Sequence, residues 1–396
     1  MKKILMMLPD GIKNPCGGLG VHVFQVLREF QKQKPEYKFF VLGRNFDDFH
    51  KGENYEFCPI REDTLDFEEL WKGDSSLHHF YFQTYYYDTA ISLADSHKFD
   101  LIICYDWSTY LAGKMLRRRY DIPLVSYIQL SMWAMDKGRT KLDMEERYFD
   151  AVYNYKLITA MNETEKLMAK ESDEMIFVSK AVRKEFPGSE GAHIIYNGIV
   201  KEDYEKFQDY EFPGNPENKK IVFVGRLNHQ KGIHELLNAK IPKNNDLIIV
   251  GGNRGGSMFG NFTGEEYVQK YVEHNPNIFH LGYQTGQELV NIFHSADAIV
   301  MPSRKEPFGI VALEALICGT PLITTAVDGM TEFLTPQSYL KIDTVSSEDI
   351  SIALQNFNSL TDDEIQAMVS EGRKVCEKFT WEKTVQEYRK VLEKYI

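Results

Sequence analysis

The stretch SADAIVMPSRKEPFGIVALEALICGTPLI, residues 295–323, shows how this chain is built. A short apolar run at 298–301 leads into a polar turn, an apolar helical run follows at 310–318, and Gly319 ends it before the next apolar run at 322–325. Short runs that are apolar throughout are typical of parallel strands covered on both faces of a sheet. Strands and helices in alternation predict an α/β fold with a parallel sheet.

The same alternation continues over the rest of the chain. Strands are expected at residues 4–8, 39–42, 101–104, 124–128, 175–178, 194–196, 221–224, 247–250, 278–281, 298–301 and 322–325. Helices are expected at residues 21–30, 141–170, 233–239, 265–274, 287–294, 310–318 and 381–396. The polar stretch 202–219 contains Pro213, Gly214 and Pro216 and predicts a linker. The sequence therefore predicts two α/β halves, with ligands at the carboxyl ends of their strands.

The charge of the chain argues against one class of binding partner, nucleic acid. The 396 residues carry a net charge of −12 and contain no long basic stretch, so nucleic acid is not an expected partner. The most basic run is Lys114 with Arg117, Arg118 and Arg119. We expect it to be a solvated helix face, and a weak contact with an anionic membrane surface is the alternative.

Targeting signals and metal-binding patterns are not expected. Pro9 and Asp10 end the first apolar run too early for a signal peptide, and no run approaches the ~20 apolar residues of a membrane-spanning helix. The five cysteines are scattered without a Cys-x-x-Cys pair, which argues against a disulfide framework and a zinc site. We therefore expect a soluble, cytoplasmic protein.

A glycine-rich loop follows the first expected strand. It reads Gly17-Gly18-Leu19-Gly20 and lies directly before the first expected helix. Glycines allow a ligand to approach the backbone closely, and a helix N-terminus offers N–H groups and a positive dipole. Gly18, Leu19 and Gly20 are therefore candidates for binding a phosphate or a sugar hydroxyl, and a flexible turn is the alternative.

A basic turn follows the expected strand at 221–224. The stretch VGRLNHQKG at 224–232 places Arg226 and Lys231 five residues apart, so both can converge on one anion. The Arg fork and the Lys point charge together suit a pyrophosphate. The alternative is a charged turn at the surface.

Two glutamates bracket the turn inside the opening stretch. Glu306 precedes the helix expected at 310–318, and Glu314 lies within it. Glu306 is a candidate for holding sugar hydroxyls and Glu314 for binding a ribose diol, while a solvent-facing helix acid is the alternative for Glu314. The first N–H groups of the helix are candidates for binding phosphate: those of Phe308, Gly309, Ile310 and Val311.

In these segments the chain resembles the family 4 retaining glycosyltransferases, which have the GT-B architecture. The matching stretches in the second half are IIYNGI (194–199), VGRLNHQKG (224–232), GY (282–283), 295–323 and VDGMTEFL (327–334). The first half matches more loosely, through GGLG, FDLIICYDW (99–107) and MIFVSKAV (175–182). Glu306 and Glu314 match the two glutamates of the family signature.

The resemblance implies a fold and a set of roles. It implies two Rossmann-like domains facing a central cleft: residues 1–200 on the acceptor side, residues 201–378 on the nucleotide-sugar side, and a C-terminal helix, 379–396, that crosses back. Arg226 and Lys231 would stabilise the leaving diphosphate, Glu306 would hold the transferred sugar, and Tyr283 would border the base. A UDP-sugar is the expected donor, the transferred unit is a hexose or N-acetylhexosamine, and no metal or other cofactor is expected.

The acceptor side departs from the family pattern. Many members place a histidine near the transferred sugar, where this chain has Gln129, which donates a hydrogen bond but carries no proton. Gln129, Asp106 and Trp133 are the acceptor-side candidates, and a helix N-terminal acid is the alternative for Asp106. The aromatic run Tyr81, Phe82, Tyr85, Tyr86 and Tyr87 is expected in an acceptor loop, with core packing as the alternative.

The sequence leaves other functions open. A glycan, a protein and a small molecule are all acceptable acceptors. A glycoside phosphorylase or a sugar-nucleotide epimerase of the same architecture is an enzymatic alternative. A non-catalytic partner subunit is the alternative outside enzymes. The four charged residues Arg226, Lys231, Glu306 and Glu314 disfavour this last class, because such a subunit has no chemical reason to keep them together.

Overall fold

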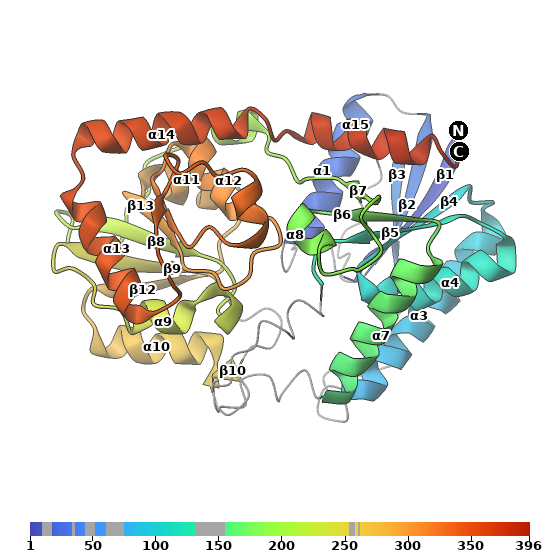
Figure 1. Ribbon diagram of the computed structural model, residues 1–396, viewed down its shortest axis with the longest axis horizontal. Helices are drawn as coiled ribbons and strands as arrows, with labels where there is room; N and C mark the ends of the chain where they lie inside the picture. Colours follow the sequence, from blue (N-terminus) through green and yellow to red (C-terminus); the bar gives the residue numbers. More distant parts are fainter. Residues whose placement is uncertain are drawn as a thin grey trace. The chain divides into compact units, whose positions relative to one another are not determined.

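The computed structural model describes residues 1–9, 18–33, 36–43, 52–60, 75–131, 155–252, 258–259 and 262–396. These residues form two compact units (Figure 1). The first contains the described residues up to 131, residues 155–197 and the C-terminal segment Trp381–Ile396. The second is Gly198–Thr380.

The first unit is built on a seven-stranded sheet in the order β3-β2-β1-β4-β5-β6-β7, with every neighbouring pair parallel. The strands are β1 (Lys2–Met7), β2 (Tyr37–Gly43), β3 (Tyr55–Pro59), β4 (Leu101–Tyr105), β5 (Leu124–Ile128), β6 (Glu174–Phe177) and β7 (His193–Ile194). The central strands are fully buried, as their continuous apolar runs require.

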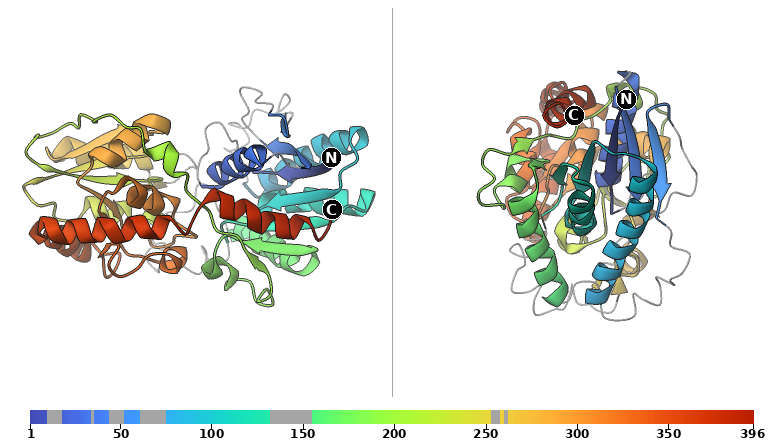
Figure 2. Two further views of the ribbon diagram at one scale, coloured as in Figure 1. Left: turned by 90° about the horizontal axis from the view of Figure 1, so that it is seen from above. Right: turned by 90° about the vertical axis from the view of Figure 1, so that its right-hand side faces the viewer.

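Helices cover both faces of this sheet. They are α1 (Gly18–Lys32), α3 (Ser75–Ser96), α4 (Trp107–Tyr120), α7 (Tyr155–Glu171), α8 (Lys180–Arg183) and α15 (Trp381–Leu392). α1 and α15 pack against each other on one face, whereas α3, α4 and α7 form a layer on the other (Figures 1 and 2). The last helix of the chain therefore completes the first unit.

The second unit has a six-stranded sheet in the order β12-β9-β8-β13-β14-β15, again parallel throughout. Its strands are β8 (Lys219–Val224), β9 (Asn245–Val250), β12 (Ile278–Gly282), β13 (Ala298–Met301), β14 (Leu322–Thr324) and β15 (Leu340–Lys341), and β10 (Met258–Phe259) and β11 (Phe262–Thr263) form a separate antiparallel pair. Its helices are α9 (Ile233–Leu237), α10 (Gly264–His274), α11 (Gly286–Ser295), α12 (Ile310–Cys318), α13 (Ser347–Ser359) and α14 (Asp362–Cys376). Three short 3-10 helices are η1 (Lys201–Tyr204), η2 (His229–Lys231) and η3 (Asp328–Glu332).

Every strand expected from the sequence overlaps an observed strand, and the two parallel sheets confirm the predicted α/β class. β3, β15 and the short pair β10 and β11 were not expected. β3 is an edge strand that carries Glu56 and Pro59, and β15 has only two residues, so neither shows a continuous apolar run. Of the helix expected at 141–170, residues from Tyr155 onward form α7, and residues 141–154 lie outside the described part.

The aromatic run at 81–87 does not form a loop. It lies within α3, where Tyr86 is fully buried and its hydroxyl donates a hydrogen bond to the carbonyl oxygen of Leu8. The expectation of an acceptor loop here is wrong. The core-packing alternative describes Tyr86, because a helix that covers a sheet presents large apolar side chains to it.

Three of the four basic residues of the run on α4 lie beside acids. Lys114 forms an ion pair with Glu171 (2.7 Å), Arg117 with Asp173 (2.5 Å), and Arg118 lies 3.8 Å from Glu171. These contacts match a solvated, ion-paired helix face. Among the described helices, none combines the length and the apolar character needed to cross a membrane.

Candidate functional site

Two loops of the second unit are bound to each other at the carboxyl edge of its sheet. One follows β8 and the other follows β13, its neighbour in the sheet. The N–H of Arg304 donates to the carbonyl oxygen of Gln230 (2.8 Å), and the Gln230 side chain donates to the carbonyl oxygen of Lys305 (3.1 Å). The sheet order thus brings together two segments that lie some seventy residues apart in the sequence.

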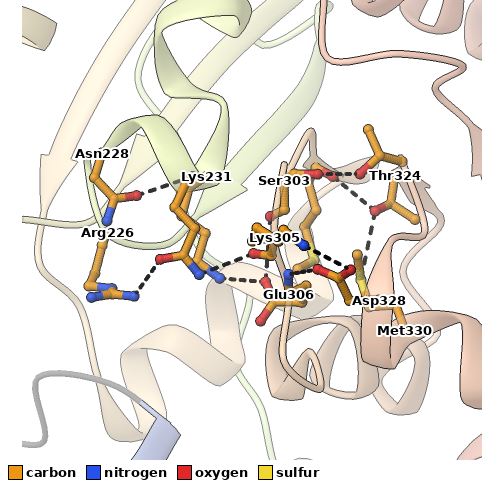
Figure 3. Close-up of polar contacts among 12 residues, drawn as sticks. Arg226, Asn228, Lys231, Ser303, Lys305, Glu306, Thr324, Asp328 and Met330 are labelled. Carbon is orange, nitrogen blue, oxygen red and sulfur yellow. Dashed lines mark hydrogen bonds and ion pairs between the residues drawn. The ribbon is translucent and has the colours of Figure 1, made fainter. Parts of the chain in front are cut away.

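The two loops join Lys231 to Glu306. The Lys231 ammonium donates to Oε2 of Glu306, and Figure 3 shows the two side chains pointing toward each other. Glu306 is only 7% exposed, so its charge needs a cation nearby. The Asn228 side chain accepts the N–H of Lys231 (3.1 Å) and fixes the short helix η2 that carries the lysine.

A third loop, after β14, holds the backbone of Glu306. The N–H of Glu306 donates to Oδ2 of Asp328 (3.1 Å; Figure 3). The N–H of Gly329 donates to the carbonyl oxygen of Glu306 (3.0 Å). Lys305 lies 3.6 Å from Asp328. Burial raises the pKa of the Asp328 carboxyl, although the Glu306 N–H and Lys305 oppose this. Glu306 is therefore held by both its side chain and its backbone.

Two arginines in these loops have different surroundings. Arg304 forms a bidentate pair with Glu235 (2.6 and 2.8 Å), and despite the burial of Glu235 this pair lowers the pKa of its carboxyl. Arg226 is only partly buried, and one end of its guanidinium donates to Gln230 (3.0 Å). Arg304 thus serves the structure, whereas the remaining donors of Arg226 suit an anion beside Lys231.

The helix α12 begins directly after this site. Gly309 occupies its N-cap position with φ of 101°, and no side chain caps the helix. The first N–H groups of a helix have no partner within it and carry a partial positive charge. The Phe308 side chain is 2% exposed and packs against Phe333 and Phe379, so its ring belongs to the core of the unit.

Glu314 lies one turn further along α12 and has a partner that the sequence did not reveal. The hydroxyl of Tyr204, in η1, donates to Oε1 of Glu314 (2.8 Å). Burial raises the pKa of the Glu314 carboxyl, and the bond from Tyr204 opposes this rise.

The candidate Tyr283 lies elsewhere along the same edge of the sheet. It follows β12 next to Gly252, and it is 38% exposed.

The first unit holds the remaining candidates. Gly18, Leu19 and Gly20 form the first turn of α1, after β1. Asp106 stands at the N-cap position of α4 without capping it, and its Oδ1 accepts instead the N–H groups of Gln129 (2.8 Å) and Leu130 (3.3 Å). Trp133 lies outside the described residues.

Gln129 belongs to a buried network around His22, which the sequence did not reveal. The Gln129 amide donates to Oδ1 of Asn197 (3.4 Å), which also contacts Nδ1 of His22 (2.6 Å). Nε2 of His22 contacts the Tyr388 hydroxyl (2.6 Å), and burial lowers the pKa of His22 to about 3, so the ring is neutral. The Gln129 side chain is 7% exposed, and its amide is hydrogen-bonded to Asn197 inside the first unit.

Comparison with known proteins gives the chain its family. The model described as Glycosyltransferase Family 4 matches residues 16–203, and the model described as Glycosyl transferases group 1 matches residues 205–375. The chain belongs to the family 4 glycosyltransferases. An uncharacterized glycosyltransferase of Methanocaldococcus jannaschii is 33% identical over 253 residues, or 60% of each chain. Glycogen synthase of Mycobacterium tuberculosis is 28% identical over 59% of this chain, which spans about half (53%) of that relative.

Solved structures place this family 4 chain in the GT-B fold. Sucrose-phosphate synthase from Thermosynechococcus elongatus superposes with a TM-score of 0.78 at 19% identity, covering 100% of this chain and 99% of that one. Anabaena HepE in complex with UDP-glucose gives a TM-score of 0.70 at 17% identity, with both chains covered completely. At such identities the likeness concerns the fold.

Other residues of the candidate site were missed by sequence reasoning. Asp328, Ser303 and Asn228 hold Glu306 and Lys231, and Tyr204 holds Glu314. Asp328 had a usable signal, because it is an acid in the loop after a strand, at the ligand-binding edge of the sheet. Tyr204 had none, since it lies in a polar linker. The described residues contain no group of three or more His, Cys, Asp or Glu side chains arranged to hold a metal ion.

Proposed function

We propose that this protein is a retaining glycosyltransferase that moves a hexosyl or N-acetylhexosaminyl unit from a UDP-sugar to a glycan, protein or small-molecule acceptor. The observation that carries the proposal is the Lys231–Glu306 pair at the uncapped N-terminus of α12. It combines a cation, a carboxylate and free backbone donors, which are the groups that a sugar diphosphate needs. The family supports the reaction class, and the UDP-glucose complex of HepE supports a uridine donor.

The groups divide the donor between them. The diphosphate is proposed to bind Arg226, Lys231 and the N-terminal N–H groups of α12, because all present positive charge. Glu306 accepts hydrogen bonds from the sugar hydroxyls, and Glu314 from the ribose diol. Tyr283 borders the base. The Lys231 ammonium remains on Glu306 while it approaches the diphosphate, so it fixes the sugar and its leaving group together.

The transfer then needs stabilisation of charge more than a protein nucleophile. The bond from the anomeric carbon to the phosphate oxygen breaks, and its electron pair leaves with the diphosphate. The acceptor hydroxyl oxygen bonds to the anomeric carbon on the same face, and its proton moves to a diphosphate oxygen. Lys231 and Arg226 stabilise the developing charge, an effect worth about 3–4 kcal/mol for one donor in a closed site.

A panel of nucleotide sugars tests this proposal. We expect slow release of nucleotide from a UDP-sugar by the wild-type protein, and release at least about 100-fold slower by Glu306→Gln. Glu348→Gln, an exposed glutamate in the first turn of α13, is the matched control and should act as wild type. Once an acceptor is found, proton NMR of the glycoside reports whether the configuration is retained. Silence across the panel, with no nucleotide bound, would favour a non-catalytic partner subunit or a phosphorylase.

A further inference from the structure

Tyr204 connects the linker to the candidate ribose-binding acid. It ends η1, in the segment that enters the second unit, while Glu314 lies 110 residues further along the chain in α12. The phenol hydroxyl donates to Oε1 of Glu314 at 2.8 Å. In the described part of the chain, Oε2 has no hydrogen-bond partner. One carboxylate oxygen is thus fixed by the phenol, and the other is left with its acceptor capacity unused among the described residues.

The position of Tyr204 is fixed from its other side by α11. The carbonyl oxygen of Tyr204 contacts Nε2 of His294 (2.7 Å), and Phe207 stacks on the His294 ring with centroids 3.7 Å apart. Further along, the N–H of Gln208 donates to Asn291 (2.9 Å). The segment after η1 is therefore anchored along α11, and the phenol is held in place before any ligand arrives.

We infer that Tyr204 is a positioning residue that orients the Glu314 carboxylate, and so sets how strongly this site recognises the ribose hydroxyls of a nucleoside diphosphate. The inference rests on the proposed function, in which Glu314 accepts hydrogen bonds from the ribose. A carboxylate on a flexible side chain must be ordered when it binds a diol. The bond from Tyr204 supplies this order in advance, since one rotamer of Glu314 satisfies both partners.

The bond also affects the charge of Glu314. Burial raises the pKa of Glu314, and the Tyr204 hydroxyl counters this because it stabilises the carboxylate. Burial and Glu314 itself raise the pKa of Tyr204 well above its usual value, so the phenol remains a donor. The titratable groups around the pair on η1, α11, α12 and α14 are Asp203, His294, Cys318, Arg373 and Cys376. Loss of the phenol should therefore raise the pKa of Glu314, so that nucleotide affinity begins to fall at a higher pH when the solution is acidified.

Calorimetric titration with UDP and with 2′-deoxyuridine diphosphate tests the inference without requiring activity. In Tyr204→Phe, which keeps the ring, we expect UDP to bind about tenfold more weakly, while the deoxy compound changes little. The ratio of the two affinities should fall toward one, as it should in Glu314→Gln. Tyr210→Phe is the matched control from the same segment and should keep the wild-type ratio.

The outcomes separate the inference from the proposed function. If Glu314→Gln loses the ratio but Tyr204→Phe keeps both ratio and affinity, the inference is overturned and the ribose site stands. Equal weakening of both ligands in Tyr204→Phe would indicate a structural role alone and would also overturn it. Wild-type protein that does not bind UDP would contradict the proposed donor, and the inference with it. His294→Ala loosens Tyr204 without touching the phenol and should lower the ratio, so an unchanged ratio in this variant counts against the inference.

Discussion

At the scale of single residues, Asp106 combines an unusual backbone with an unusual environment. Its φ of 55° and ψ of 177° lie in a region that residues with a Cβ rarely adopt. Its carboxyl is held by the N–H groups after β5, and burial raises its pKa to about 7, although those two bonds oppose the rise. A conformation that costs stability at the carboxyl edge of a sheet is typical of a functional residue.

The raised pKa makes stability depend on pH. Between its usual value and about 7, folded Asp106 holds a proton that the unfolded chain releases, so its contribution to stability falls as pH rises through this window. Asp106→Asn removes the titration and keeps the acceptor oxygen. We expect the melting temperature of the variant, relative to wild type, to rise between about pH 5 and about pH 8.

Asp121→Asn is the matched control, because Asp121 also has a positive φ (54°) but is exposed at the other end of α4. It reports how an Asp-to-Asn change at an exposed position of the same helix affects the melting temperature over the same pH range. A constant difference for Asp106→Asn would show that Asp106 titrates normally.

At the scale of elements, the site depends on close approach of three loops. Gly309 lies between Glu306 and α12, and its φ of 101° is one that residues with a Cβ rarely adopt. A Cβ added there would also stand 2.7 Å from Cγ of Met330. Gly329 faces the carbonyl oxygen of Pro307 so closely that a Cβ would collide with it. These two glycines allow the β13 and β14 loops to hold Glu306 between them.

Gly309→Ala is therefore expected to destabilise the protein by about 1–3 kcal/mol and to weaken donor hydrolysis more than tenfold, since it displaces both Glu306 and the helix N-terminus. Chemical denaturation and nucleotide release measure the two effects. Gly191→Ala, where a Cβ meets nothing within 4 Å, should leave both unchanged. Wild-type turnover in Gly309→Ala would mean that this helix N-terminus does not contact the donor.

Sequence reasoning predicted elements better than contacts. The apolar runs of β13 and α12 gave bounds that match the structure, because burial on both faces leaves a clear signal. The same reasoning selected Lys231 and Glu306, and the order of β8 and β13 in the sheet places them in contact. It did not reveal Tyr204 on Glu314 or Asn197 on Gln129, since such long-range pairs leave no periodic pattern.

At the scale of the whole molecule, the C-terminus belongs to the first unit. Tyr388 of α15 is fully buried there, where its hydroxyl contacts Nε2 of His22 (2.6 Å) and the Tyr105 hydroxyl (3.0 Å). Its ring stacks on Tyr127 with centroids 5.7 Å apart. The chain thus returns to its first unit through a polar contact inside an apolar core, which fixes the position of α15 more specifically than apolar packing alone.

Tyr388→Phe leaves the packing but removes the hydroxyl, so His22 loses a partner in a buried site. We expect a loss of about 1–3 kcal/mol in the free energy of unfolding, measured by urea denaturation. Tyr395→Phe removes an exposed hydroxyl that donates to the carbonyl oxygen of Asp173, and should cost at most about 0.5 kcal/mol. An equal loss in the free energy of unfolding for the two variants would show that the buried hydroxyl of Tyr388 stabilises the protein no more than an exposed one.

The most direct test of the whole account is the affinity of UDP for wild type and Lys231→Ala, measured by calorimetry on protein whose fold is checked by circular dichroism. Lys341→Ala, an exposed lysine paired with Asp343 in the same unit, is the control. The account predicts that wild type and Lys341→Ala bind UDP alike and that Lys231→Ala binds it at least about 100-fold more weakly, the loss of one charged contact to a diphosphate. Equal affinity in all three proteins, or no binding by wild type, would contradict a UDP-sugar site built on Lys231.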